Sequence, residues 1–243
     1  MTIGDEETAS KSGVPVGSGA PVGRRVVLGM LGLGALGVVA GKSIQGGLDS
    51  VLSPIQRLDP TGLAALIPGD YFRIYTVTSG YPLETDAEYR LTVDGMVDTP
   101  RVLTVADLQA MPATSMVRTF QCVTGWRVPN VHWTGVKLSD LLGVVGVAKG
   151  ATALRFESFD GVYTESLTLA QAARPDIIVA YSMLGGAVSR EHGGPVRLYV
   201  APMYGYKSIK WLSRITVVDT VEPGYWEHYG YAVDGWIGRS NGY

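Results

Sequence analysis

The chain has 243 residues, of which 46% are hydrophobic and 17% are charged, and its formal net charge is −2. This composition is typical of a globular protein with a substantial core, and it offers no basic field of the kind that binds nucleic acid. Three histidines and a single cysteine are too few for a zinc cage of Cys and His, and neither C-x-x-C nor H-E-x-x-H occurs in the sequence.

Residues 1–41 are predicted to be a leader that is separate from the folded body. The leader begins with a small, polar and glycine-rich stretch that cannot bury enough apolar surface to fold. Arg24 and Arg25 then precede an uncharged run, Val26–Ala40, which is short for a membrane-spanning helix. A paired arginine before a short, moderately apolar core resembles a twin-arginine export signal, and a membrane-anchor helix is the alternative.

Both interpretations of residues 24–41 have the same consequence for location. The paired arginine is expected on the cytoplasmic side, because positive charge next to an apolar segment stays there. The body of the protein is therefore expected outside the cytoplasm, in the periplasm or cell envelope, either released or anchored to the membrane.

Residues 42–68 are expected to form a linker, and residues 69–243 the folded domain. Apolar and polar residues alternate over Tyr89–Val97, which predicts a half-buried strand. A short helix is predicted next. Thr104 and Asp107 have the spacing of a capping box at its start, and a proline marks its end.

The second half of the domain is predicted to mix short helices and strands. One helix begins with Ser139 as its N-cap, and a later one is ended by Pro175. Between them, Ala153–Phe159 predicts a strand that turns back at Asp160 and Gly161. Because the order of helices and strands is irregular, an α+β fold is favoured over a wound βαβ sheet. Further strands are predicted at residues 162–167, 176–183, 195–202 and 211–219.

The single cysteine, Cys122, lies in a segment rich in tryptophan and glycine. A disulfide within the chain is excluded, so the thiol is a buried apolar filler, a nucleophile or a metal ligand. Two later segments, residues 191–202 and 204–211, combine glycines with histidine, arginine and lysines. Such a combination predicts an anion site, with a solvated basic edge strand as the alternative.

Together these segments resemble the molybdopterin-binding domain of the sulfite oxidase superfamily, in particular its exported bacterial branch with the catalytic subunit of methionine sulfoxide reductase. The resemblance extends from about Tyr71 to Asp219. It is carried by "CVTGW" at Cys122–Trp126, "W.GV.L.DLL" from Trp133, "HGGPVRL" at residues 192–198 and "GYKSIKW" at residues 205–211, in that order. It implies a mixed-sheet domain that binds a molybdenum-molybdopterin cofactor.

The resemblance also implies roles for individual residues. Cys122 corresponds to the cysteine whose thiolate binds molybdenum, and Tyr163 to a tyrosine that binds substrate or delivers protons near the metal, with simple packing as the alternative. Trp126 and Trp133 would exclude water, although Trp133 is expected to be a core residue. Arg73 stands where the exported branch carries asparagine. The implied cofactor contacts are Arg73, Tyr75, Thr76, Ser158, His192, Arg197, Ser208, Ile209 and Lys210.

The function implied is that of an exported mononuclear molybdenum oxidoreductase that transfers an oxygen atom to or from a small S- or N-oxide. No C-x-x-C-H haem motif occurs, so electrons are expected to pass to or from another protein, such as a membrane haem protein. The expected partners are thus a small-molecule substrate, an electron-transfer protein and the twin-arginine export machinery, and the chain is expected to be a monomer because no further domain follows.

Two other functions are compatible with the residues. The first is a cysteine hydrolase with Cys122 as nucleophile and His132 or His192 as base. The second is a non-catalytic, membrane-tethered binding domain of the same fold. The role of the aromatic tail at residues 223–243 also stays open, because the tail could either cover the site or contact a partner.

Overall fold

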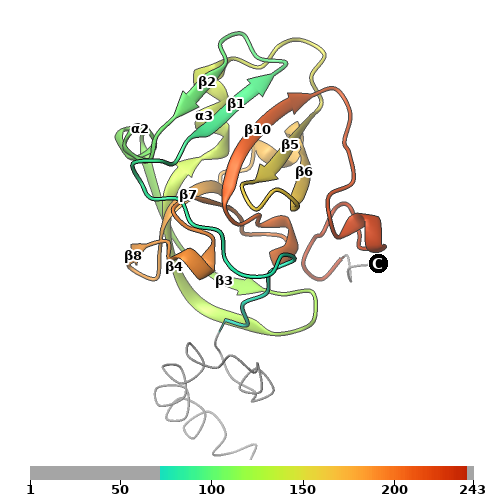
Figure 1. Ribbon diagram of the computed structural model, residues 1–243. Coiled ribbons are helices and arrows are strands. Elements are labelled where there is room, and N and C mark those ends of the chain that lie inside the picture. The colour runs from blue at the N-terminus through green and yellow to red at the C-terminus, as the bar shows by residue number, and fades with distance from the viewer. Residues whose placement is uncertain (1–71, 240–243) are drawn as a thin grey trace, which may run out of the picture. The chain divides into compact units, whose positions relative to one another are not determined.

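The computed structural model describes residues 72–239, and the predictions made for residues 1–68 lie outside that range. The described part is built on two β-sheets with short helices between the strands (Figure 1). Within it, no helix combines the length and the apolar character that crossing a membrane requires.

The first sheet contains five strands and is mixed, as predicted. The strand at the start of the domain runs parallel to the last one, and the other neighbouring strands are antiparallel. Four of the five strands were predicted from the sequence. In spatial order the strands are β2 (Arg101–Leu103), β1 (Leu91–Gly95), β10 (Leu212–Val218), β5 (Ala153–Ser158) and β6 (Thr164–Thr168).

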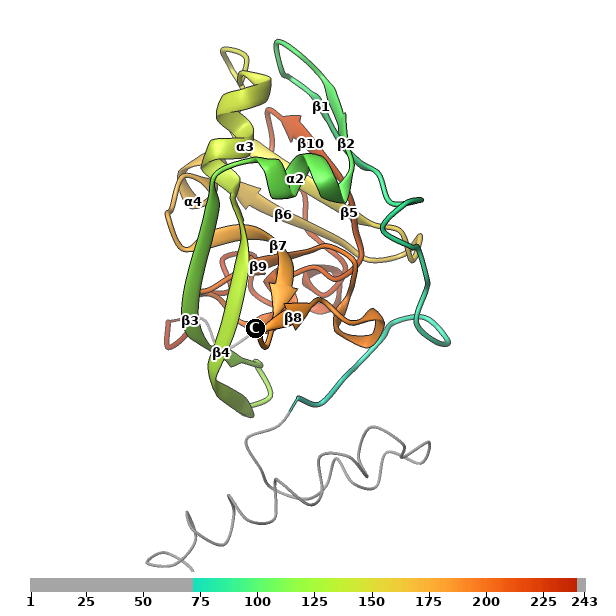
Figure 2. The same cartoon turned by 90° about the vertical axis from the view of Figure 1, so that its left-hand side faces the viewer.

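The second sheet is antiparallel and is dominated by one long hairpin. Figures 1 and 2 both show this hairpin, β3 and β4, along one side of the domain. The sequence did not predict it, because β3 exposes most of its side chains and lacks the alternation of a half-buried strand. The strands are β3 (Ala113–Gln121), β4 (Arg127–Lys137), β7 (Ile177–Met183) and β8 (Gly186–Ala187), with β9 (Arg197–Val200) also paired to β7.

The helices are short. Thr104 and Asp107 form the predicted capping box at the start of the first one, with each side chain bonded to the other residue's backbone N–H. The prediction that Ser139 is an N-cap is wrong, because the next helix already begins at Leu138 and Lys137 occupies the cap position. The α-helices are α2 (Val105–Ala110), α3 (Leu138–Val145) and α4 (Leu169–Ala172), and the 3₁₀ helices are η2 (Arg190–His192), η3 (Gly205–Lys207) and η4 (Glu227–Tyr229).

Two clusters of buried side chains hold this framework together. The larger one includes Phe156 and Ile215 of the first sheet. The smaller one lies on the second sheet, where Trp133 is 1% exposed and stacks on Tyr199 with 4.0 Å between ring centroids. Trp133 is therefore a core residue, as expected. Stacked aromatic rings of this kind stabilise a core beyond the area they bury, and they give the base of the β3–β4 hairpin a fixed position.

Candidate cofactor and metal site

A cavity of about 410 Å³ lies where the tip of the β3–β4 hairpin meets segments from both ends of the described chain. Its lining is mostly apolar and aromatic, which is typical of a pocket that encloses an organic ligand. The charged side chains among the lining residues are Arg73, Asp160, Glu191, Arg197 and Lys210. The lining comes from residues 72–77, 120–126, 160–163, 191–197, 205–211 and 226–231.

Cys122 lies at the first position of the tight turn that joins β3 to β4. Its backbone carbonyl accepts a hydrogen bond from the N–H of Gly125 at 3.1 Å, and its own N–H donates to the carbonyl of Trp126 at 2.9 Å. Gly125 has a φ of 99°, a conformation that favours glycine and explains the G of "CVTGW". The thiol is half-buried and lines the cavity, and its sulfur accepts a hydrogen bond from the hydroxyl of Thr124 at 3.3 Å. It is not an apolar filler of the core.

Trp126 forms an aromatic wall beside the thiol. Its ring stacks on Phe120 with 5.8 Å between centroids and meets the ring of Phe72 edge-on at 6.3 Å. The indole Nε1 is buried and has no hydrogen-bond partner within residues 72–239. A buried donor without a partner is costly, so this N–H fits a ligand that brings an acceptor into the cavity.

Arg197 is a buried cation on the cavity wall. Only 3% of the residue is exposed, and its guanidinium donates to the carbonyls of His192 at 2.7 Å and Ser208 at 2.8 Å. No carboxylate within residues 72–239 forms an ion pair with it. Desolvation lowers the pKa of Arg197 to about 10. Because burying an unpaired charge is expensive, the site fits an anionic ligand.

Lys210 brings a second cation to the same wall. Its Nζ donates to the carbonyl of Tyr75 and lies 4.2 Å from the ring centroid of Trp211. Burial, and then the charge of Arg197, lower the pKa of Lys210 to about 7. The side chain passes close to Gly193, where a Cβ would lie 2.5 Å from the Cβ of Lys210. The glycines of "HGGPVRL" thus leave room for a cation beside the cavity.

The segment before β1 supplies three further predicted residues. Arg73, Tyr75 and Thr76 all line the cavity. The Nε of Arg73 is buried and lacks a hydrogen-bond partner within the described residues. Arg73 therefore adds a third cationic side chain to the cavity.

His192 and Ser208 also line the cavity as predicted. The ring of His192 meets the ring of Phe72 edge-on at 4.8 Å. The hydroxyl of Ser208 accepts a hydrogen bond from the N–H of Val200 at 2.9 Å, so it fixes the backbone of the wall. His132, the other candidate base of a cysteine hydrolase, is exposed on β4 and is not among the cavity-lining residues.

Two predicted contacts are not brought to the cavity. Ser158 is buried in β5, and its hydroxyl accepts a hydrogen bond from the N–H of Asp160 at 3.1 Å, which closes the turn after the strand. Ile209 is 1% exposed and packs in the larger core cluster, while its neighbours Ser208 and Lys210 reach the cavity.

Tyr163 lies on the cavity wall, directly before β6. Its hydroxyl donates to the carbonyl of Tyr206 at 2.7 Å, and its ring stacks on Tyr225 with 5.6 Å between centroids. Burial, and then the charge of Glu165, raise the pKa of Tyr163 well above its ordinary value. The hydroxyl is therefore protonated at neutral pH and available as a hydrogen-bond donor.

Several lining residues were not predicted as contacts. Thr124 lies two positions after the cysteine, and the shared turn was a signal that could have identified it. Trp226 and Tyr231 show that the C-terminal aromatic segment contributes to the cavity, which the sequence left open. No pattern in the sequence indicated Asp160, Gly205 or Tyr206.

The residues present fit an organic cofactor with anionic groups and a metal. Three cationic side chains and a buried indole N–H line the cavity, and one thiol lines it too. Within residues 72–239 no group of three or more His, Cys, Asp and Glu side chains is placed to hold a metal ion. Cys122 is thus a single sulfur donor beside a pocket suited to an anionic organic group.

Comparison with known proteins agrees with this chemistry. The family model of the oxidoreductase molybdopterin binding domain matches residues 78–226. Sulfite oxidase of Arabidopsis thaliana is 32% identical over 177 residues, which are 59% of this chain and 45% of that protein. YuiH, an uncharacterised oxidoreductase of Bacillus subtilis, is 32% identical over 169 residues, which are 65% of this chain and 84% of that protein.

Two further similarities extend the comparison. A putative protein-methionine-sulfoxide reductase subunit, YedZ1 of Azospira oryzae, is 30% identical over 193 residues, 75% of this chain and 70% of that protein. The crystal structure of the sulfane dehydrogenase SoxCD from Paracoccus pantotrophus matches with a TM-score of 0.55 and 27% identity, over 59% of this chain and 41% of that chain.

The chain spans less than half the length of the plant sulfite oxidase and most of the length of YuiH. The matched family model covers more than half of the chain and includes Cys122, Arg197 and Lys210. A domain of this kind implies a molybdenum-molybdopterin cofactor. The protein therefore belongs to the molybdopterin-binding oxidoreductases of the sulfite oxidase type.

Proposed function

We propose that this protein is a mononuclear molybdenum oxidoreductase that transfers an oxygen atom to or from a small S- or N-oxide, with Cys122 as the protein's ligand to the metal. The observation that carries the proposal is that the only thiol of the chain shares one cavity with the buried cation Arg197 and the half-buried cation Lys210. The same three residues lie in the motifs from which the family resemblance was drawn.

The cofactor would be held by two kinds of contact. Arg197 and Lys210 would neutralise its anionic groups, and Arg73 would add a third positive charge at the opening segment of the domain. Tyr75, Thr76, His192 and Ser208 would line its organic part, with Ser208 contributing through the backbone that its hydroxyl fixes.

Cys122 would bind the metal as a thiolate, because soft sulfur ligands suit a high-valent metal that an organic dithiolene already holds. When bound, molybdenum supplies two-electron oxygen-atom transfer. Thr124 donates a hydrogen bond to the sulfur and would tune its electron density. Trp126 and Phe120 would keep water away from the sulfur.

Tyr163 is the proposed contact to substrate. Its protonated hydroxyl lies on the cavity wall, where it could donate a hydrogen bond to an oxide oxygen after leaving the carbonyl of Tyr206. This role would be lost in Tyr163→Phe, which keeps the ring that stacks on Tyr225.

Export and electron transfer complete the proposal. Arg24 and Arg25 would direct the chain through the twin-arginine machinery, and the domain would work outside the cytoplasm. The electrons would be exchanged with a separate protein, such as a membrane haem protein. Support for both steps comes from the sequence motifs alone.

The test is to purify the full chain and a Cys122→Ala variant from a host that makes the cofactor. We expect about one molybdenum atom and one pterin per wild-type chain, and oxidation of a reduced dye in the presence of at least one S- or N-oxide from a panel. Cys122→Ala should lose this activity. His132→Ala is the matched control, because His132 is exposed and outside the cavity.

Three results would contradict the proposal. A metal-free protein whose activity is abolished by thiol alkylation would indicate a cysteine hydrolase. A metal-free and inactive protein from the same host would indicate a binding domain. Retention of full molybdenum and activity in Cys122→Ala would show that another group binds the metal.

A further inference from the structure

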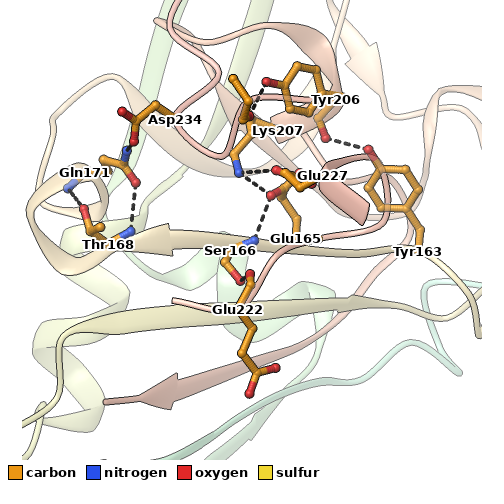
Figure 3. A network of polar contacts seen from close by, with 12 residues as sticks. Tyr163, Glu165, Ser166, Thr168, Gln171, Tyr206, Lys207, Glu222, Glu227 and Asp234 are labelled. Atoms are coloured by element: carbon orange, nitrogen blue, oxygen red, sulfur yellow. Dashed lines mark hydrogen bonds and ion pairs between the residues drawn. The ribbon is translucent and has the colours of Figure 1, made fainter. Parts of the chain in front are cut away.

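A buried ion cluster lies directly behind the cavity wall, at Glu165, Lys207 and Glu227 (Figure 3). We refer to these three residues as the buried triad. The side chains of Glu165 and Lys207 are 0% exposed, and that of Glu227 is 1% exposed. The ammonium group of Lys207 donates to Oε1 of Glu165 and to Oε1 of Glu227, the latter at 2.8 Å.

The triad holds one carboxylate too many for its single ammonium group. The second oxygen of each carboxyl group, Oε2 of Glu165 and Oε2 of Glu227, is buried and has no hydrogen-bond partner within residues 72–239. One proton on one of the two carboxyl groups would remove both the excess negative charge and the lack of a hydrogen bond between the buried oxygens. It neutralises the extra charge, and it supplies an O–H donor to the other carboxylate, as in other carboxyl pairs that cannot both ionise.

The protonation is supported by the burial of Glu165. Desolvation is the largest cause that raises the pKa of Glu165 well above its ordinary value, and the nearby charge of Glu227 raises it further. The opposing charge of Lys207 lowers it but does not outweigh them. The N–H of Ser166 donates to Oε1 of Glu165 at 2.9 Å, so that oxygen is already satisfied and the proton belongs on the Oε2 side.

The other titratable groups around the triad do not supply the positive charge that would make this proton unnecessary. Arg155 lies with Glu165 on a second cavity of about 370 Å³, but its guanidinium is engaged with Glu157 at 3.6 Å and Glu222 at 3.4 Å. His228 lines the same cavity, with its Nδ1 2.7 Å from the carbonyl of Gly224. The remaining groups are Asp160, Tyr163, Tyr206 and Asp234.

Each member of the triad is next to a residue that lines the cofactor cavity. Glu165 lies on β6, two positions after Tyr163, which directly precedes the strand and lines the cavity. Lys207 lies between Tyr206 and Ser208, two lining residues on η3 and its cap.

The third member connects the C-terminal segment to the same point. Glu227 directly follows Trp226, whose side chain lines the cavity. The segment packs closely on the triad, since a Cβ on Gly235 would lie 2.6 Å from the Cγ of Lys207. The triad thus ties together three separate walls of the cavity, from β6, η3 and η4.

We propose that Glu165 and Glu227 share a single proton, and that the resulting neutral triad is a positioning device that holds these three walls of the cavity together until the proton is lost as the pH rises. The functional consequence rests on the proposed role of the cavity as the cofactor site. The shared proton and the pH-dependent loosening concern the protein alone.

The sign of the pH effect follows from the direction of the shift. A folded-state pKa above the ordinary value of 4.5 means that the folded protein keeps a proton on Glu165 that the unfolded chain has released. This contribution to stability is therefore lost as the pH rises from about 4.5 through the folded-state pKa. For a domain of this size, one proton corresponds to a fall in Tm of about 3–5 °C per pH unit within that window.

The experiment compares the full-length wild type with Glu165→Gln and Glu227→Gln, because glutamine keeps the shape of a protonated carboxyl group. Glu222→Gln is the matched control, since Glu222 pairs with Arg155 at the surface. Tm is measured from about pH 5 to about pH 9. Infrared spectra over the same range record the C=O stretch of a protonated carboxyl group. Acrylamide quenching of tryptophan fluorescence records the exposure of Trp226, which is obtained by subtracting the signal of Trp226→Phe.

As the pH rises, we expect the Tm of the wild type and of Glu222→Gln to fall, their protonated-carboxyl band to disappear and Trp226 to become exposed. The same changes should be much smaller in Glu165→Gln and Glu227→Gln. An unchanged pH profile in both glutamine variants would overturn the proposal. If neither variant folds, the infrared spectrum of the wild type decides, because absence of a titrating carboxyl band excludes the shared proton. All three measurements work without the cofactor, so their failure is distinct from a failure of the proposed function.

Discussion

Arg197 and Lys210 lie on the cavity side of the wall without a carboxylate partner among the described residues, whereas Lys207 lies behind the wall with two. Arg197 and Lys207 are buried and Lys210 is half-buried, and in neither arrangement does the protein alone provide the matching number of opposite charges. In the first, positive charge is in excess and fits an anionic ligand. In the second, negative charge is in excess and fits a proton. The sign of the uncompensated charge thus indicates which species each region takes up.

The largest effect is expected for Lys207→Met. Removing the ammonium group leaves two buried carboxyl groups without their cation, and breaking a buried pair in this way costs about 3–5 kcal/mol of unfolding free energy. Urea denaturation near neutral pH measures it. A loss of less than about 1 kcal/mol would mean that the triad is not a stabilising cluster and would remove the contrast with Arg197.

Arg197→Met should act on the cofactor instead. Loss of a buried, hydrogen-bonded cation is expected to weaken cofactor binding by about 2–5 kcal/mol, a factor of about 30 or more. The apoprotein should change in stability by only about 1 kcal/mol, because the unpaired charge that it loses was itself costly. Pterin content and denaturation of the apoprotein check the two parts. A strongly destabilised apoprotein would mean that Arg197, like Lys207, stabilises the folded protein itself.

Lys210 should affect the pH dependence of the apoprotein's stability in the direction opposite to Glu165, and Lys210→Met should remove this effect. The pKa of Lys210 is lowered from 10.5 to about 7, so the folded protein releases a proton that the unfolded chain still holds between those values. Stability of the apoprotein should therefore rise with pH across that window, by at most about 1.4 kcal/mol per pH unit. The variant should lack this rise in denaturation curves taken at several pH values. An unchanged profile would show that the lysine titrates normally.

The smallest effect is expected for Arg214→Met, which provides the reference for a cation at the surface. Arg214 pairs with Asp94 at 2.9 Å, with 45% and 28% of the two side chains exposed. Such a pair is worth at most about 1 kcal/mol, and less at high salt. Denaturation at low and high salt measures it. A cost as large as that of Lys207→Met would mean that burial does not distinguish these cations.

Much of the fold could be predicted where local sequence determines local structure. Thr104 and Asp107 start a helix because their side chains satisfy backbone groups a few residues away. Ser139 is a favourable N-cap residue, but α3 begins at Leu138 with Lys137 as its N-cap, two residues earlier than predicted. The β3–β4 hairpin was missed because β3 is largely exposed, and its pairing with β4 is not visible in the period of its side chains.

The candidate site was predictable through its motifs but not through its packing. Cys122, Arg197 and Lys210 lie in three separate motifs, and the structure brings them to one cavity. Ile209 was predicted as a contact because it lies in a segment whose backbone and lysine the resemblance places against the cofactor, whereas its side chain packs in the larger core cluster. The buried triad had no signal, because Glu165 and Glu227 look like ordinary surface residues until the fold buries them.

The parallel pairing of β1 with β10 joins the beginning of the domain to its end. The cavity repeats that arrangement, since residues 72–77 and 226–231 both line it. During synthesis, the ribosome releases the last of these segments only when nearly the whole domain has been made, so a growing chain has no complete pocket to offer. Loading of the cofactor would therefore follow synthesis of the whole domain, and contacts so distant in sequence make the final assembly of the pocket a slow step of folding.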